Sequence, residues 1–108
     1  MAKLVTKLNG SFDQICTRIH DGILQGSVSA SLEDSWSMKD GNSRIAVMVF
    51  ERYSYFGGNR VSMNVTLYQE GDGPVYLCAI TAGGSQAVFF KVNTIGEESF
   101  LDTLREIL

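Results

Sequence analysis

Few residues in this chain have types and spacings that could do chemistry. The single histidine, His20, is the only side chain whose ordinary pKa lies near neutrality, and it stands beside Asp21 in a predicted helix. Adjacent residues of a helix do not face each other, so an oriented histidine–aspartate pair is not expected. General-base chemistry at His20 would also need a nucleophile brought near by the fold. The sequence therefore predicts a histidine at the flank of a helix, in a protein that is not an enzyme.

The two cysteines are far apart in the sequence and do not form a metal site. Cys16 lies on the apolar stripe of a predicted helix, and Cys78 lies in a predicted strand. Metal binding needs several converging ligands, and the acidic turn at residues 70–73 is not a calcium-binding loop. Because no secretory signal is recognisable, both thiols are expected to be reduced and buried. We therefore expect no disulfide, no metal and no cofactor.

A glycine-rich segment follows the last predicted long strand. It consists of Gly83, Gly84, Ser85 and Gln86. Its backbone N–H groups could bind an anion, but it lacks the Gly-Lys-Ser/Thr ending and the following helix of a phosphate-binding loop. A close turn of the chain against the sheet explains the two glycines as well. The structural interpretation is favoured, and a ligand site is the alternative.

A polar and aromatic zone follows the apolar run at residues 45–50 and continues across the next turn. Its members are Glu51, Arg52, Tyr53, Tyr55 and Arg60. Arginine and tyrosine are enriched at interface hot spots, so the zone is a candidate interface or ligand site. The alternative is surface decoration, with Glu51 paired to Arg60 or Lys39 in solvent. Such an exposed ion pair contributes only about 0–1 kcal/mol.

Two amphipathic helices are predicted, over residues 11–25 and 96–108. The first begins at a capping box, in which the Ser11 hydroxyl accepts a hydrogen bond from the Gln14 amide. Apolar residues then recur at helical spacing as far as Ile23. Thr94 and Glu97 resemble a second capping box. The apolar stripe behind it consists of Phe100, Leu101, Leu104 and Leu108.

Alternating apolar and polar residues predict strands at residues 3–8, 27–33, 44–55, 61–68 and 75–80. Turn sequences at residues 40–42, 57–59 and 71–74 separate most of them. Residues 87–92 are a short strand or an extended packed loop. Strand alternation places Trp36 on the same side as Leu32, which predicts packing at the edge of the core. An exposed anchor for a partner is the alternative for Trp36.

The predicted order is β-α-β-β-β-β-(β)-α, in one domain over residues 1–108. Runs of hairpins with helices set apart indicate an α+β fold. We expect a five- or six-stranded, mostly antiparallel sheet with two helices on one face. The other face is expected to carry one side of the apolar strand and small polar residues, namely Ser27, Ser29, Ser31, Ser62, Asn64 and Thr66.

The register of the central hairpin stays open. A two-residue loop at Gly57-Gly58 pairs Phe50 with Val65 and turns Glu51 and Tyr53 away from the core. A three-residue loop through Asn59 instead pairs Val49 with Leu67 and turns Arg52 and Ser54 away. One residue of slip exchanges the two faces of a strand.

The composition excludes some partners and favours others. Charged residues make up 19% of the chain, against about 25% in typical soluble domains. The net charge of −3 and the scattered basic residues argue against nucleic-acid and membrane-surface binding. No stretch approaches the ~20 apolar residues of a membrane span. The charge deficit predicts an apolar surface that is covered in a homo-oligomer, with a dimer favoured, or by a small apolar ligand.

Three stretches of the chain, residues 27–34, 49–62 and 82–90, resemble a family of small bacterial proteins known only as a domain of unknown function. The resemblance covers nearly the whole chain. It implies no activity, substrate or site residue, and it points to a bacterial cytoplasmic setting.

The favoured hypothesis is a non-enzymatic cytoplasmic domain that self-associates through the open face or edge of its sheet. The alternative is a small-molecule binding module with a pocket between the sheet and a helix. The residues expected near that pocket are Tyr53, Tyr55, Phe89 and Phe90. An enzyme is the weakest hypothesis.

Overall fold

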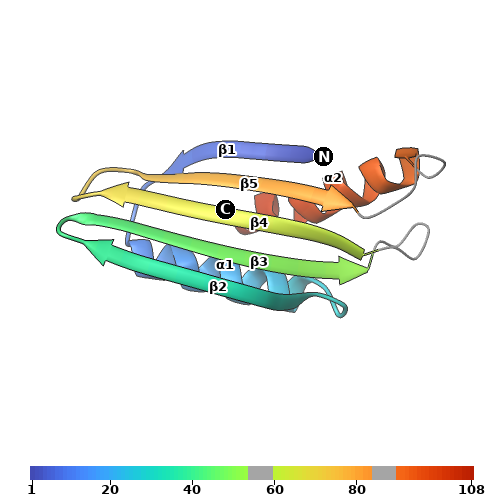
Figure 1. Cartoon of the computed structure of the whole chain (residues 1–108), viewed down its shortest axis with the longest axis horizontal. Coiled ribbons are helices and arrows are strands. Elements are labelled where there is room, and N and C mark those ends of the chain that lie inside the picture. Colours follow the sequence, from blue (N-terminus) through green and yellow to red (C-terminus); the bar gives the residue numbers. More distant parts are fainter. Residues whose placement is uncertain (54–59, 84–89) are drawn as a thin grey trace.

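The computed structural model describes residues 1–53, 60–83 and 90–108, the last range without the side chains of residues 90–95. The elements, in chain order, are β1 (Ala2–Leu8), α1 (Phe12–Gly26), β2 (Ser31–Asp40), β3 (Ser43–Tyr53), β4 (Arg60–Glu70), β5 (Val75–Gly83) and α2 (Phe90–Ile107). The strands form a five-stranded sheet in the order β1-β5-β4-β3-β2 (Figure 1). Every neighbouring pair is antiparallel.

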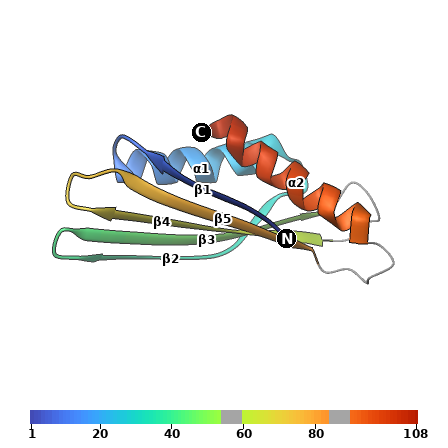
Figure 2. The same ribbon diagram turned by 90° about the horizontal axis from the view of Figure 1, so that it is seen from above.

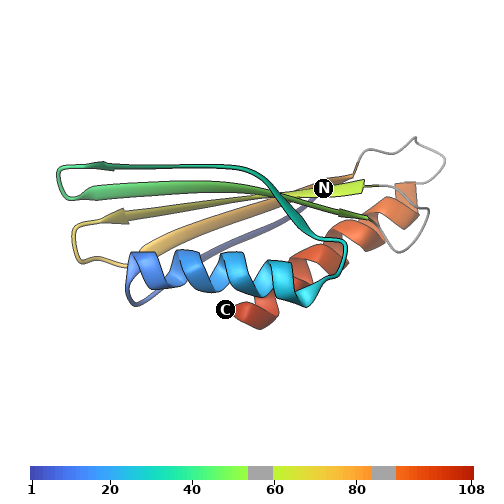
Figure 3. The same ribbon diagram turned by 90° about the horizontal axis from the view of Figure 1, so that it is seen from below.

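The protein has two layers. Both helices lie on the same side of the sheet, and no described helix lies on the other side (Figures 2 and 3). A five-stranded antiparallel sheet with two helices on one face confirms the predicted α+β fold. We call the uncovered side of the sheet the outer face.

Helix α1 forms where its capping box and apolar spacing predict it. The backbone N–H of Gln14 donates to Ser11 Oγ at 3.4 Å, which satisfies one of the free donors at the start of the helix. The apolar stripe contains Phe12, Ile15, Ile19 and Ile23, all of which are buried. Because this stripe lies against the sheet, α1 is held mainly by tertiary packing.

Helix α2 begins earlier than predicted. It starts at Phe90 instead of residue 96, so Thr94 lies inside the helix and does not cap it. Glu97 is buried, and its Oε2 lies 2.7 Å from the amino nitrogen of Met1. Residues 90–92 are helical, whereas the sequence offered a strand or an extended loop. A short apolar run is compatible with a helix as well as with a strand. Periodicity alone therefore could not assign residues 90–92 to the helix.

Strand β2 lies further along the chain than predicted. Ser27 follows the end of α1, and residues 27–30 turn the chain back toward the sheet with a hydrogen bond from Ala30 N–H to the Ser27 carbonyl at 3.3 Å. The expected places of Ser27 and Ser29 on the outer face are therefore wrong, and Val28 is fully exposed. The β2–β3 turn carries Gly41 at φ 58°. This tight turn places Asp40 opposite Ser43, and β2 then stays paired with β3 as far back as Ser31. The length of β2 therefore follows from its pairing with β3.

A β-bulge in β2 reverses the faces of its second half. Leu32 pairs with Phe50 on the helix side, and Asp34 pairs with Val49, so that Glu33 is an extra residue between them. Every later residue of β2 then points to the side opposite to that expected from unbroken alternation. Trp36 therefore pairs with Val47 on the outer face and is 55% exposed. The prediction that Trp36 packs at the edge of the core is wrong.

The register of the central hairpin differs from both predicted registers, the one for a two-residue loop and the one for a three-residue loop. Phe50 pairs with Met63, and Tyr53 pairs with Arg60. This pairing differs by two residues from the one expected for a loop at residues 57–58, and a two-residue shift preserves the faces. Tyr53 therefore points to the outer face, while Arg52 points to the helices. The loop itself, residues 54–59, lies outside the described residues.

The core lies between the helices and the inner face of the sheet. Its largest fully buried side chains on the sheet are Phe50, Met63, Leu67, Leu77, Val61, Val65 and Val75. Those on the helices are Ile19, Ile23, Phe100, Leu101 and Leu104. The helix-covered face of the sheet therefore provides the hydrophobic core, and the outer face contributes none of these largest buried side chains.

Candidate functional site

The outer face is built from three rows of side chains that cross all five strands, because residues paired across neighbouring strands share a face. The Asp34 row contains Lys3, Ile80, Asn64, Val49 and Asp34. The Trp36 row contains Val5, Cys78, Thr66, Val47 and Trp36. The Met38 row contains Lys7, Tyr76, Tyr68, Ile45 and Met38. This is the face turned toward the viewer in Figure 1.

Large apolar side chains are exposed to solvent near both edges of the outer face. Trp36 and Met38 on β2 are 55% and 49% exposed, and Val5 on β1 is 65% exposed. Ile80 on β5 is 40% exposed. Single exposed apolar residues are ordinary, but several large ones on one face of a sheet indicate an interaction surface. The outer face is therefore the candidate site of this protein.

Two of the residues that the middle strand presents on the outer face are polar and small. Asn64 and Thr66 on β4 separate the apolar residues of β3 from those of β5, and Thr66 Oγ1 donates to Asn64 Oδ1 at 3.1 Å. Small side chains at the centre allow another surface to approach closely. The predicted positions of Ser62, Asn64 and Thr66 on this face agree with the register.

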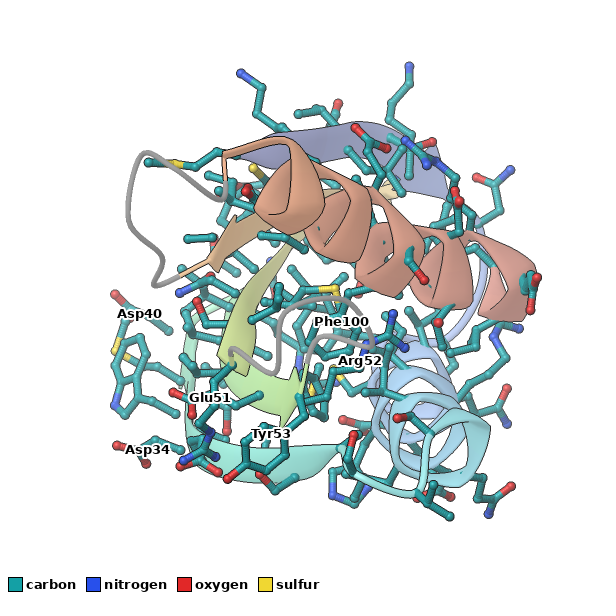
Figure 4. The ribbon with its side chains drawn as sticks, turned by 90° about the vertical axis from the view of Figure 1, so that its right-hand side faces the viewer. Asp34, Asp40, Glu51, Arg52, Tyr53 and Phe100 are labelled. Atoms are coloured by element: carbon teal, nitrogen blue, oxygen red, sulfur yellow. The ribbon has the colours of Figure 1, made fainter. Side chains whose placement is uncertain are left out.

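The two edges of the outer face carry opposite charges. Lys3 and Lys7 lie on the edge strand β1, and the structure gives neither an ion pair within the described part of the chain. Asp34 and Asp40 lie on the opposite edge strand β2. Figure 4 shows both aspartates on the side of the sheet away from the helices. The face is thus polarised across its width.

One end of the outer face holds a small charged cluster that the sequence predicted in part. Arg60 Nη2 lies 2.8 Å from Glu51 Oε1 and 3.7 Å from Glu33 Oε2. The Arg60 guanidinium lies 5.7 Å from the centre of the Tyr53 ring. Sequence reasoning named Glu51, Tyr53 and Arg60 together. It missed Glu33, which joins them through the bulge of β2.

Arg52 is separated from this cluster by the sheet. Its guanidinium lies 4.4 Å from the centre of the Phe100 ring, between sheet and helices (Figure 4). Nη1 donates to Thr103 Oγ1 at 3.2 Å, and Nη2 donates to Ser99 Oγ at 3.0 Å. Burial lowers the pKa of this guanidinium below its ordinary value. Arg52 therefore ties β3 to α2.

Replacing Arg52 by alanine is expected to lower the free energy of unfolding by about 1–3 kcal/mol, since two charge-assisted hydrogen bonds and the stacking on Phe100 are lost. Arg52→Lys should recover only part of this, because an ammonium lacks the planar fork of arginine. Urea unfolding followed by circular dichroism measures the change. Arg60→Ala is the matched control on the outer face, and equal losses for the two alanine variants would contradict the assignment.

Of the remaining sequence-predicted site residues, the structure describes Tyr53 and Gly83. Tyr53 points away from the helices, so it does not line a pocket between sheet and helix. Gly83 is the last residue of β5. The side chain of Phe90 and residues 55, 84–86 and 89 (Tyr55, Gly84, Ser85, Gln86 and Phe89) lie outside the described residues.

His20 and Asp21 do make contact, contrary to the prediction from helix geometry. His20 Nδ1 lies 2.9 Å from Asp21 Oδ1. Both side chains stand at the helix surface, where they can turn toward each other around the helix. No hydroxyl or thiol of the described residues is hydrogen-bonded to His20, and its ring lies 6.4 Å from that of Phe50. The arrangement orients the imidazole and supplies no nucleophile to it.

The cysteines lie on opposite sides of the sheet. Cys16 is half-buried on α1, where burial raises the pKa of its thiol. Cys78 is also half-buried, but it belongs to the outer face. Both are free thiols. Within residues 1–53, 60–83 and 90–108, no group of three or more histidine, cysteine, aspartate or glutamate side chains is placed to hold a metal ion.

A groove of about 200 Å³ lies between α1 and the β2–β3 edge of the sheet. Its lining includes Phe12, Cys16, Trp36, Arg44 and Met48. Arg44 pairs with Asp13, and its guanidinium lies 4.6 Å from the centre of the Phe12 ring. Apolar residues and the charged pair Asp13–Arg44 both line this small groove, which lies at a place that sequence reasoning did not predict.

Together these features define an α+β protein in which both described helices cover one face of the sheet, and no helix of the described residues covers the other. No helix in the described ranges is both long enough and apolar enough to span a membrane. The chain belongs to the family of unknown function DUF6054, whose model matches residues 1–108, and this confirms the resemblance seen in the sequence. Neither a curated protein nor a solved structure is found to match the chain.

Proposed function

We propose that this protein is a non-enzymatic domain that self-associates through the outer face of its sheet, with a homodimer as the unit. The observation that carries the proposal is the set of exposed apolar side chains on that face, including Trp36, Met38 and Ile80. Burial of a large apolar side chain in an interface can stabilise the complex by up to roughly 1.5–3 kcal/mol. Tryptophan, tyrosine and methionine are also the residue types enriched at protein interfaces.

A second copy of the chain is the occupant that the face fits best. The deficit of charged residues, 19% of the chain, leaves too little polar material to cover both sides of a two-layer domain. The outer face is one side of a β-sheet, and sheets pack on one another face to face about 10 Å apart. We further infer a bacterial cytoplasmic setting, which the two free thiols support.

The oligomeric state tests the proposal. We expect sedimentation velocity at micromolar concentration to give twice the chain mass of 11.9 kDa. Ile80→Asp should give the monomer, because an exposed residue of the free chain would become an unpaired carboxylate in an apolar interface. Val47→Asp on β3 should act in the same way.

The control is Thr17→Asp, which adds the same charge to the exposed surface of α1 and should leave the dimer intact. Circular dichroism of each variant separates dissociation from unfolding. A wild-type protein that remains a monomer at about 100 μM would overturn the proposal, since a Kd above that value is too weak for a stable interface.

A small-molecule binding module is the second candidate, and the groove between α1 and the β2–β3 edge favours it. A free volume of about 200 Å³ is below the range of ≈ 300–1,000 Å³ for drug-sized ligands. Native mass spectrometry of the purified protein would show a retained ligand. A monomer that carries such a ligand would make this candidate the better one.

A further inference from the structure

The three rows of the outer face are nearly self-complementary about their own centre. The middle strand of the sheet is β4, which contributes Asn64, Thr66 and Tyr68, one to each row. Apolar residues flank this strand on both sides. The edge strands then carry basic residues on β1 and acidic residues on β2. A surface of this kind can meet a copy of itself in only a few ways.

Two identical sheets that stack with their strands aligned can be related by either of two twofold axes in the interface plane. An axis parallel to the strands places β1 of one copy over β2 of the other. An axis perpendicular to the strands places β1 over β1 and β2 over β2. The charges on the edges distinguish the two arrangements.

The perpendicular axis is unfavourable at the β1 edge. It exchanges the Asp34 row with the Met38 row, so Lys3 of one copy lies opposite Lys7 of the other. Four lysines then gather on two facing strands, and the structure offers them no acidic partner there. Like charges placed opposite each other across an interface oppose association.

Within the three rows, the parallel axis gives most residues a matching partner, whereas Arg60 and Glu70 of β4, outside the rows, would each meet their own counterparts at the ends of the axis. Each row meets itself in reverse order, so Lys3 lies opposite Asp34 of the second copy. Lys7 lies opposite Met38, one row from Asp40. The apolar residues pair with one another, as Val5 with Trp36, Ile80 with Val49, Cys78 with Val47, and Tyr76 with Ile45.

We propose that two copies pack outer face to outer face about a twofold axis parallel to the strands and centred on β4, with reciprocal Lys3–Asp34 ion pairs at the two edges. This inference rests on the proposed self-association and specifies its geometry. Asn64, Thr66 and Tyr68 meet their own counterparts on the axis, and the small size of Asn64 and Thr66 allows close approach at that end. Because each sheet is twisted, the strands of the two copies cross at roughly 30°. The residues paired above therefore lie near one another and not directly opposite.

Edge-to-edge pairing of two β2 strands is the competing arrangement between copies. It leaves the apolar outer face in solvent, because the joined sheets are still one layer. The β-bulge at Glu33 and the charged side chain of Lys39 are features that protect an edge strand from such pairing. Face-to-face stacking is therefore the geometry that we test.

Charge reversal gives opposite results for the two axes. With the parallel axis, Lys3→Asp should raise the dimer dissociation constant by about tenfold, since two attractive pairs become repulsive. The double variant Lys3→Asp/Asp34→Lys should restore the wild-type value. With the perpendicular axis, Lys3→Asp should instead tighten the dimer. Lys39→Asp, on the inner side of β2, is the matched control and should change little.

Cross-linking provides an independent readout. In a background without native cysteines, Thr66→Cys should cross-link two copies through a short bis-maleimide, because Thr66 lies on the axis. Native Cys78, with Cys16 replaced by serine, should cross-link far less efficiently, because it lies opposite Val47 and two strand spacings, about 10 Å, to the side of its own counterpart. The perpendicular axis would place Thr66 and Cys78 each opposite its own counterpart, so linkage through Cys78 as efficient as linkage through position 66 would overturn the inference.

The outcomes separate the inference from the proposed function. A dimer that is unaffected by Lys3→Asp, or that the double variant fails to restore, refutes this geometry and leaves self-association standing. A wild-type monomer refutes both. A weaker dimer in Lys3→Asp, with recovery in the double variant, supports both.

Discussion

Replacing Ile19 by aspartate is expected to prevent folding. Ile19 lies on the buried stripe of α1 and has no exposed surface. An aspartate there would bury an unpaired carboxylate and remove an apolar side chain, at a cost of several kcal/mol. The total stability of a domain of this size is only ~5–15 kcal/mol. Circular dichroism should show loss of the cooperative thermal transition.

Thr17→Asp is the matched control for this experiment. It places the same side chain two residues away on the solvent-exposed surface of α1. Surface substitutions of this kind usually change stability by no more than about 0.5 kcal/mol. An Ile19→Asp protein that melts like the wild type would show that the stripe of α1 is not part of the core.

Replacing Phe100 by alanine is expected to lower the free energy of unfolding by about 3–5 kcal/mol. Phe100 is fully buried on α2 and supports the guanidinium of Arg52 at 4.4 Å. The variant therefore leaves a cavity and removes the stacking partner of a half-buried charge. Urea unfolding measures the loss, and the protein should remain folded at low temperature if its wild-type stability lies well above this cost.

Phe100→Leu separates the two contributions. It keeps most of the apolar volume but removes the aromatic ring, so its loss should be clearly smaller than that of the alanine variant. In the Arg52→Ala background, Phe100→Leu should cost less than in the wild type, because the stacking has already been lost. Independent, additive effects of the two substitutions would contradict direct coupling between Arg52 and Phe100.

Local features of the sequence predicted local structure well. The start of α1 was predicted from Ser11 and Gln14, whose hydrogen bond is present. The alternation in β4 predicted which of its residues are buried, and Gly41 and Gly71 take the positive φ that their turns require. Each of these features depends on residues within a few positions of one another. The α+β class follows from them, because it needs only the order and type of the elements.

The candidate site could be predicted only in part. The charge deficit and the apolar run at residues 45–50 predicted a surface in need of cover. Glu51, Tyr53 and Arg60 were predicted as neighbours, and they are neighbours. Arg52, named with them, lies on the other side of the sheet. The contributions of β1 and β2 to the outer face could not be predicted, because they depend on which strands are adjacent.

The sequence by itself thus determined the helices, most of the strands, the α+β class and the excess of apolar surface. Only the tertiary structure decided which face each strand presents. Periodicity describes one strand at a time, whereas a face is set by pairing with a strand distant in sequence. A single extra residue, Glu33, turned Trp36 from the core side to the outer face. The register that pairs Phe50 with Met63 turned Arg52 toward the helices, since a one-residue slip exchanges the two sides of a strand.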